Sequence, residues 1–375
     1  MELCRITGDF PGGNIKVVSM RGHEIGVDVE MRDSTGDWFY WCFKAHFREP
    51  GQYHFEFPRP GKVGTRGPAI SLDGGINWRW LSAGRRDDSQ GFDYFCPKAG
   101  EEVLFCTGIQ YLQRDLEAFL EEFSGTPFLQ KAVLCRSRKG RNVELLSVVE
   151  GHPKYTVLLT SRHHSVEMMA THVLEGILRT TLEDSDFGRN FRRSIALFAI
   201  PFVDKDGVEE GDQGKNRAPH DHARDYQVPS LYPETAAIRE WISRCKPDFL
   251  LDLHCPLLSG PLRENPALIG SGNPRMDAAM ERFSDCLEQY RIPEAPYFNQ
   301  NNIPFGYAWN VPENFTQGLT MTRYAARFPF VSSAQTMEIP FANFGERTAD
   351  RNSMLRFGGS IARALLLFLR EKETR

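Results

Sequence analysis

Three His-x-x-Glu pairs are the first feature of this sequence that suggests chemistry, because an imidazole and a carboxylate at this spacing can bind one metal ion. Their contexts differ. His46 and Glu49 are followed by Pro-Gly in a β-rich region, which is typical of a solvated hairpin end. His172 and Glu175 lie inside an expected helix, where residues three apart share a face, and we interpret them as structural.

The third pair, His164 and Glu167, lies between an expected strand at 156–160 and an expected helix at 166–181. This order places the histidine at the carboxyl end of the strand and the glutamate in the first helical turn, so that both can reach one point. Imidazole nitrogen and carboxylate oxygen bind zinc at about 2.0–2.2 Å. The alternative for this pair alone is a capping box or a surface polar pair.

A third ligand is expected at the end of another strand, because catalytic zinc sites use three protein ligands and a water. His254 ends the apolar run 249–253 and meets this requirement. Asp252 is a candidate for orienting an imidazole from behind. A buried histidine with satisfied hydrogen bonds is the alternative, but two strand ends with compatible ligands favour one zinc ion per chain.

Glu338 is the one acid in the apolar run 334–340. A carboxylate in such a run is costly unless it is paired or functional. Next to a water activated by zinc, it would act as a general base. The alternative is a buried ion pair with an arginine.

A polar, irregular segment over 211–226 follows the expected strand at 195–202. It carries Asn216, Arg217 and Arg224, and the two guanidinium groups are suited to binding a carboxylate or a developing oxyanion. His220 and His222 form a His-x-His pair in the same segment. Flanking acids and arginines favour a hydrogen-bonded loop there, and we predict no second metal site.

The elements that must position these residues change character near residue 108. Before it, short alternating runs separated by Gly and Pro predict an all-β sandwich, including strands at 38–47, at 53–57, near 78–81 and at 92–96. After it, strands and helices alternate, which predicts an α/β fold with a mixed, mostly parallel sheet and helices on both faces. We therefore predict an N-terminal domain over 1–108 and a catalytic domain over 109–375. The expected strands of the second domain are 144–149, 156–160, 195–202, 249–253 and 336–340, and its expected helices are 112–123, 166–181, 233–244, 274–290 and 354–370.

The overall composition is that of a globular protein without an unusual charge. The 375 residues include 45 basic and 49 acidic side chains, a formal net charge of −4, which suggests neither a nucleic acid nor a membrane as partner. No apolar run reaches the length of a membrane span, and no secretory signal is recognisable. The eight cysteines contain no Cys-x-x-Cys and are expected to be reduced thiols in a cytoplasmic protein.

Together these motifs resemble the zinc metallocarboxypeptidase family. That family has His-x-x-Glu after a strand, then an Asp-x-Asn-Arg block, a single zinc histidine and a catalytic glutamate on a late strand. The corresponding residues here, in the same order, are His164 and Glu167, the block Asp221-His222-Ala223-Arg224, then His254 and Glu338. The N-terminal region, with its Trp38-Phe39-Tyr40 run, is similar to the domain that precedes the catalytic unit in the cytosolic carboxypeptidase-like branch.

The sequence also departs from the family pattern. Ala223 stands where the family has Asn, so one amide that anchors the substrate carboxylate is missing, and Asn216 is a candidate substitute. The interval from Arg217 to Arg224 is short, and His254 is followed by Cys-Pro instead of Ser and an aromatic residue.

The resemblance implies a role for each candidate residue. Zinc would be held by His164, Glu167 and His254, and Glu338 would carry the proton. Arg224 would bind the terminal carboxylate of the substrate and Arg217 the oxyanion. Tyr324 would be the mobile tyrosine that covers the substrate, and Arg323 would favour an acidic C-terminal side chain.

The predicted activity is therefore hydrolysis of the C-terminal bond of a peptide or protein substrate by a zinc-dependent carboxypeptidase. Two alternatives remain open: a related zinc deacylase acting on N-acyl amino acids, and a non-catalytic binding protein whose β domain carries the function. The sequence does not indicate the natural substrate or the oligomeric state.

Overall fold

The N-terminal part of the computed structural model is a β-sandwich, as the sequence predicts; the structure describes residues 2–82, 84 and 90–371. One sheet has the strand order β1-β4-β9-β6-β7 and the other β2-β3-β5-β8. Their bounds are β1 Cys4–Thr7, β2 Lys16–Arg21, β3 Glu24–Asp28, β4 Cys42–Phe47, β5 Gly51–Glu56, β6 Ala69–Ser71, β7 Arg79–Trp80, β8 Gly91–Cys96 and β9 Glu102–Cys106. Alternate aromatic side chains fill the space between the sheets, among them the stacked rings of Phe55 and Phe92, 4.9 Å apart.

The strand expected over 38–47 is only half formed. It begins at Cys42, and residues 38–41 are not part of either sheet. The reason lies in where their backbone groups bond. The N–H of Tyr40 donates to the side chain of Gln213 in the following domain, and the N–H of Trp41 donates to Thr107 Oγ1. A backbone already bonded to side chains cannot continue a strand ladder.

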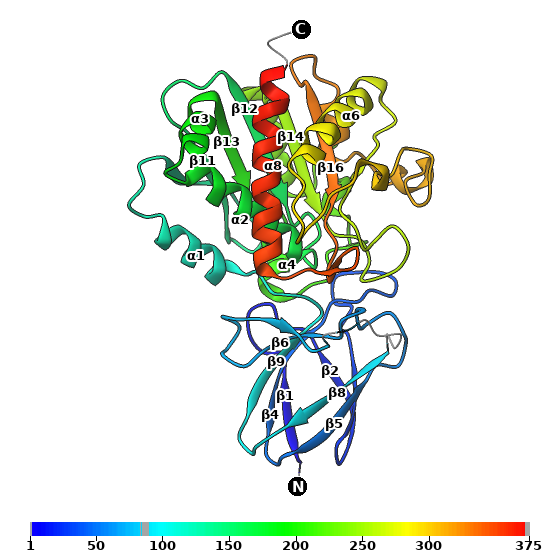
Figure 1. Ribbon diagram of the computed structural model, residues 1–375. Helices are drawn as coiled ribbons and strands as arrows, with labels where there is room; N and C mark the ends of the chain where they lie inside the picture. The colour runs from blue at the N-terminus through cyan, green and yellow to red at the C-terminus, as the bar shows by residue number, and fades with distance from the viewer. Residues whose placement is uncertain (1, 83, 85–89, 372–375) are drawn as a thin grey trace.

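The second part contains a seven-stranded sheet with the order β10-β11-β13-β12-β14-β16-β15, which confirms the predicted α/β class (Figure 1). Its four neighbouring central strands β13, β12, β14 and β16 are parallel, and the outer strands join antiparallel. The strands are β10 Leu129–Arg136, β11 Asn142–Val148, β12 Tyr155–Ser161, β13 Ile195–Ile200, β14 Phe249–His254, β15 Ala267–Ile269 and β16 Ser333–Glu338, with a small hairpin of β17 Asn343–Phe344 and β18 Arg347–Thr348. The α-helices are α1 Gln113–Glu122, α2 Met168–Leu182, α3 Asp186–Ser194, α4 Lys205–Glu210, α5 Pro233–Cys245, α6 Pro274–Gln289, α7 Met321–Ala325 and α8 Arg351–Glu371.

Helices cover both faces of this sheet because successive strand residues point to opposite sides. Val157 and Leu159 on β12 join the core formed with α2 and α8. Leu158, between them, joins the core formed with α5 and α7. Figure 1 shows the long helix α8 lying across the sheet, beside α2.

The parallel register brings the ends of three strands together. Ser161 at the end of β12 is opposite Leu253 on β14, and His254 at the end of β14 is opposite Glu338 at the end of β16. The carboxyl edge of an α/β sheet is where ligands usually bind. The candidate residues therefore gather there.

Residue 108, the predicted domain boundary, falls in the connection between β9 and α1. Of the predicted domain bounds, residue 1 and residues 372–375 lie outside the described part of the chain. Among residues 2–82, 84 and 90–371, no helix is both long and apolar enough to span a bilayer.

Candidate metal centre and substrate pocket

His164, Glu167 and His254 converge on one point at the carboxyl edge of the sheet. His164 Nδ1 lies 2.9 Å from Glu167 Oε1, and His254 Nδ1 lies 2.8 Å from Glu167 Oε2. One donor atom from each of the three residues lies within 4.8 Å of the other two. Two imidazoles and a carboxylate are the ligand set of catalytic zinc in several hydrolases, so these residues fit the metal that the sequence predicts.

The loop between β12 and α2 holds two of these ligands in place. Arg162 at its start has a left-handed backbone (φ 62°), and its buried guanidinium donates to the carbonyl oxygens of Ser165 and Tyr111. Glu167 is the residue immediately before α2, not a residue of its first turn. The ligand loop is thus fixed from inside by an arginine that the motif itself does not reveal.

Each ligand histidine is held from behind by an aspartate. His164 Nε2 lies 3.2 Å from Asp221 Oδ1, and His254 Nε2 lies 2.9 Å from Asp252 Oδ2. Such carboxylates fix the ring orientation and direct the other nitrogen, here Nδ1, toward the metal. Although burial opposes ionisation, the neighbouring histidines hold the pKa of both Asp221 and Asp252 well below the usual range.

His163 forms a second cluster with Asp252 and His254, but both of its ring nitrogens already have hydrogen-bond partners. Its Nδ1 lies 2.8 Å from Asp252 Oδ1, and its Nε2 lies 2.6 Å from the hydroxyl of Tyr226. His163 is fully buried and does not line the pocket described below. We therefore assign it a structural role, supporting Asp252.

Glu338 stands beside the ligand set at the end of β16. Burial raises the pKa of its carboxyl, the negative charge of Glu167 raises it further, and Lys215 counteracts both. Its Oε2 is shielded from solvent and has no hydrogen-bond partner among the described residues. This is the environment expected of a proton carrier and not of a carboxylate in a structural ion pair.

Lys215 is a member of the site that sequence reasoning missed. Its Nζ lies 2.5 Å from Glu167 Oε1 and 3.3 Å from the carbonyl oxygen of Cys255. Although burial opposes the charge, Glu167 and Glu338 raise the pKa of this ammonium, so it remains cationic. Nothing in its sequence context distinguishes it from a solvated lysine.

A pocket with about 590 Å³ of empty space opens in front of these residues. Its lining includes His164, His254 and Glu338 as well as Arg224 and Arg323. Among the described residues, neither guanidinium has an ion pair with a carboxylate: Arg224 donates to the carbonyl oxygens of Asn314 and Ala223, at 3.2 and 3.3 Å, and Arg323 Nη2 is buried without a hydrogen-bond partner.

Aromatic rings support the two arginines of this pocket. Arg323 Cζ lies 3.7 Å from the ring centroid of Phe315 and 5.0 Å from that of Phe305, and Arg224 Cζ lies 5.1 Å from that of Phe315. Burial and the charge of Arg224 lower the pKa of Arg323. Two guanidinium groups in one pocket, neither paired with a carboxylate of the described residues, favour an anionic ligand.

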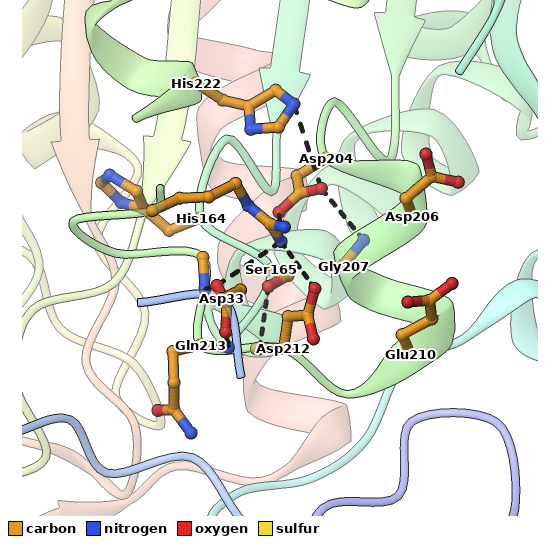
Figure 2. A network of polar contacts seen from close by, with 12 residues as sticks. Asp33, His164, Ser165, Asp204, Asp206, Gly207, Glu210, Asp212, Gln213 and His222 are labelled. Carbon is orange, nitrogen blue, oxygen red and sulfur yellow. Dashed lines mark hydrogen bonds and ion pairs between the residues drawn. The ribbon is translucent and has the colours of Figure 1, made fainter. Parts of the chain in front are cut away.

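Arg217, predicted as the oxyanion donor, lies outside this pocket. Its Nη2 lies 2.6 Å from Asp204, 3.0 Å from Asp212 and 3.6 Å from Asp33. Figure 2 shows the carboxylates of these three acids close together. Despite burial, these three acids raise the pKa of Arg217, so the guanidinium is charged, while its Nε is buried without a hydrogen-bond partner among the described residues. Because Arg217 is held by these acids and is not among the residues that line the pocket, its position gives no support to the predicted oxyanion role.

Tyr324 and Asn216 also lie away from the pocket lining. The hydroxyl of Tyr324 is 3.4 Å from Ser243 Oγ on α5, and the guanidinium carbon of Arg239 lies 5.3 Å from its ring centroid. In this position it packs on α5 and does not cover the site. Asn216 is exposed, and its N–H donates to Asp221 Oδ2 at 3.2 Å.

Comparison with known proteins agrees with the resemblance drawn from the motifs, although no family model matches the chain. The chain is 25% identical over 351 residues to an uncharacterized protein of Zymomonas mobilis, a match covering 90% of this chain and 88% of that protein. It is 24% identical over 335 residues to cytosolic carboxypeptidase 2 of Mus musculus, covering 78% of this chain. The match spans only 39% of the length of that mouse protein.

Solved structures share the whole fold. A metallo-carboxypeptidase from Burkholderia cenocepacia superposes with a TM-score of 0.82 at 17% identity, covering 98% of this chain and all of that one. A metallo-carboxypeptidase from Pseudomonas aeruginosa, in complex with (2-guanidinoethylmercapto)succinic acid, gives 0.81 at 21% identity, covering 98% and 99%. Both parts of the chain, sandwich and α/β domain, therefore belong to one known architecture.

Proposed function

We propose that this protein is a zinc-dependent carboxypeptidase that hydrolyses the C-terminal peptide bond of a peptide or protein. The observation that carries the proposal is the convergence, at one pocket, of a His-Glu-His ligand set, a glutamate and two arginines that have no ion pair among the described residues. The fold and the sequence relatives, named as carboxypeptidases, support the same activity. The eight cysteines are unpaired thiols, which supports our prediction of a cytoplasmic protein.

Glu338 is the proton carrier of the proposed reaction. When bound, a zinc ion would be held by His164, Glu167 and His254 and would supply Lewis acidity for activating a water and the scissile carbonyl. Glu338 accepts the proton of the attacking water and delivers it to the leaving amine. A carboxyl whose pKa is raised toward neutrality is suited to both steps.

We assign the oxyanion role to Lys215 in place of Arg217. Neither residue is among those that line the pocket, but the charged, partly buried ammonium of Lys215 contacts the ligand Glu167 itself, whereas Arg217 contacts acids outside the ligand set. A cation fixed there stabilises the negative charge that develops on the carbonyl oxygen when water attacks.

Arg224 and Arg323 bind the end of the substrate. A peptide with a C-terminal Glu or Asp carries two carboxylates within a few ångströms, and the pocket offers one guanidinium for each. An apolar C-terminal side chain would leave the shielded Nη2 of the half-buried Arg323 without a partner, which costs about 1–3 kcal/mol. We therefore propose a preference for acidic C-terminal residues.

Metal analysis followed by incubation with a peptide library, read by mass spectrometry, tests the activity. We expect one zinc per chain, loss of single C-terminal residues, and loss of both zinc and activity in His254→Ala. His46→Ala is the matched control, because that histidine lies on β4, far along the chain from the site, and should leave zinc in place. Cleavage of N-acyl amino acids without cleavage of peptides would identify the deacylase instead, and a zinc-free native protein would refute both.

Rates on peptides ending in Glu, Phe and Lys test the specificity. Wild-type protein is expected to prefer Glu by at least about tenfold, corresponding to about 1.4 kcal/mol. Arg323→Ala should remove this preference while hydrolysis of the Phe peptide continues. A preference for Phe or Lys that survives Arg323→Ala would refute the acidic pocket and leave the zinc mechanism standing.

A further inference from the structure

The N-terminal domain makes hydrogen bonds along the segment 211–217, which carries Lys215 to the ligand set. Asn14 Nδ2 donates to the carbonyl of Gly211 at 2.7 Å. The side chain of Gln213 exchanges two hydrogen bonds with the backbone of Tyr40, at 2.7 and 2.8 Å. These bonds connect the N-terminal domain to a segment of the second domain.

Asp33 bonds the segment close to Lys215 with its carboxylate, and Thr35 bonds Asn216 on the other side, its N–H donating to the carbonyl oxygen at 3.2 Å. The carboxylate of Asp33 accepts the N–H groups of Gln213 at 3.0 Å and Gly214 at 2.9 Å. Its carbonyl oxygen accepts the N–H of Ala218 at 2.7 Å. Asp33 therefore bonds the backbone on both sides of Lys215, and Figure 2 shows it beside Gln213.

The segment does not hold this conformation by regular structure of its own. It lies between α4 and a short turn at 222–224, and Gly211, Gly214 and Asn216 have left-handed φ angles of 70°, 75° and 47°. It also packs against the ligand loop: a Cβ on Gly214 would lie 2.3 Å from the backbone nitrogen of Ser165. Its position therefore depends on contacts from outside.

We infer that Asp33 is a positioning residue, through which the N-terminal domain holds Lys215 at the metal ligands. Asp33 is buried between the domains and lies 3.6 Å from the guanidinium of Arg217, which offsets its charge. The expected effect of Asp33 on catalysis rests on the proposed function. Its effect on the position of the segment 211–217 is independent of that function.

Asp33→Asn tests the inference. Asparagine has the same size as aspartate, but an NH₂ group replaces one of the two carboxylate oxygens. One of the backbone N–H groups of Gln213 and Gly214 therefore loses its acceptor. Because displacement of a catalytic group by about 1 Å can cost about 100-fold, we expect kcat to fall about 10–100-fold with KM changed less than about threefold and with zinc retained.

A double-mutant cycle shows whether Asp33 acts through Lys215. In a Lys215→Met background the lysine is already gone, so Asp33→Asn should lower kcat by less than about threefold further. A purely structural role would lower activity by the same factor in both backgrounds.

Hydrogen exchange read by mass spectrometry gives a measurement independent of activity. Asp33→Asn should accelerate exchange in peptides covering 211–217. Asp93→Asn is the matched control, because that carboxylate lies on β8 and contacts His54 within the N-terminal domain. It should leave both exchange and kcat unchanged.

If Asp33→Asn does not fold, Arg32→Ala provides the same test. Its partly exposed guanidinium donates to the carbonyls of Glu210 and Gly211, so its loss should also accelerate exchange in 211–217. Unchanged exchange in the folded variants, or equal losses of kcat in both backgrounds, would overturn the inference. An inactive wild-type protein whose exchange responds as expected would refute the proposed function alone.

Discussion

Two side chains beside the ligand set carry opposite charges and are expected to do different chemistry. Burial and Glu167 raise the pKa of Glu338, which makes it a better base near neutrality. Glu167 and Glu338 raise the pKa of Lys215, which keeps it a hydrogen-bond donor at every pH where the protein would work. The charge of Glu167 thus favours proton transfer by Glu338. Together, Glu167 and Glu338 favour the protonated form of Lys215.

Replacing Glu338 with Gln should abolish turnover without releasing zinc. The amide keeps the size of the side chain but cannot accept a proton, and general acid–base catalysis is typically worth about 10²–10⁴-fold. Steady-state kinetics with zinc analysis on the same sample measures both quantities. Near-normal turnover would show that the base lies elsewhere.

Replacing Lys215 with Met should lower kcat about 10²–10³-fold, which is the usual cost of losing one oxyanion donor. A phosphonate peptide that mimics the charged transition state should bind more weakly by a similar factor, whereas KM should change little. Lys215→Arg, which keeps a cation, should recover part of the rate. Equal weakening of substrate and phosphonate binding would instead assign Lys215 to substrate binding.

Helices α2 and α8 pack closely against each other because glycines lie at their contact points. A Cβ on Gly176 would lie 2.1 Å from the carbonyl oxygen of Leu355, and one on Gly358 would lie 2.3 Å from that of Val173. Because α2 directly follows the ligand loop, the spacing of these two helices also determines where His164 and Glu167 lie.

Gly358→Ala should therefore destabilise the protein by about 1–3 kcal/mol, the usual cost of overpacking, despite the better helix propensity of alanine. Urea denaturation measures the loss. Gly359→Ala is the matched control on the same helix, because its Cβ would meet the side chain of Thr180, which can rotate, and not a backbone oxygen. Equal effects of the two substitutions would contradict the close-packing argument.

The two parts of the molecule are joined by apolar as well as polar contacts, with the candidate metal centre close to the junction. The core between the two sheets of the sandwich is aromatic, and one of the two cores of the α/β domain extends into the N-terminal domain, where Phe39 contacts Phe341 with 5.6 Å between ring centroids. The contacts of Asp33 and Tyr40 with the segment 211–218 connect the two parts. Metal binding at such a place should stabilise the folded chain as a unit.

Removing zinc should lower the stability of the native protein. A ligand that binds only the folded state at about 1,000 times its Kd contributes about 4 kcal/mol, so thermal unfolding should shift down by several degrees in a chelator and recover with added zinc. His254→Ala should show no such response. A wild-type Tm that is insensitive to both treatments would argue against a tightly held ion.

Much of the site was predictable because its residues lie at strand ends. His164, His254 and Glu338 follow apolar runs that form neighbouring parallel strands, and the register of a parallel sheet brings carboxyl ends together. The α/β class and the position of most helices follow from hydrophobic periodicity for the same reason. Strands β10 and β15 were not predicted; β10 is an edge strand, and most of its side chains are exposed or half-buried.

The residues that the sequence did not place lie on irregular backbone or on a very short helix. Arg217 and Lys215 lie in the irregular segment after α4, and Tyr324 lies on the five-residue helix α7. Their side-chain directions depend on contacts with distant segments: three carboxylates, the ligand loop and helix α5, respectively. Such short or irregular segments carry no periodic signal for which side a residue faces. Hydrophobic patterning and the spacing of His and Glu at strand ends thus determined the sheet and the candidate ligands from sequence alone, whereas long-range hydrogen bonds and ion pairs decided which cation lies beside those candidates.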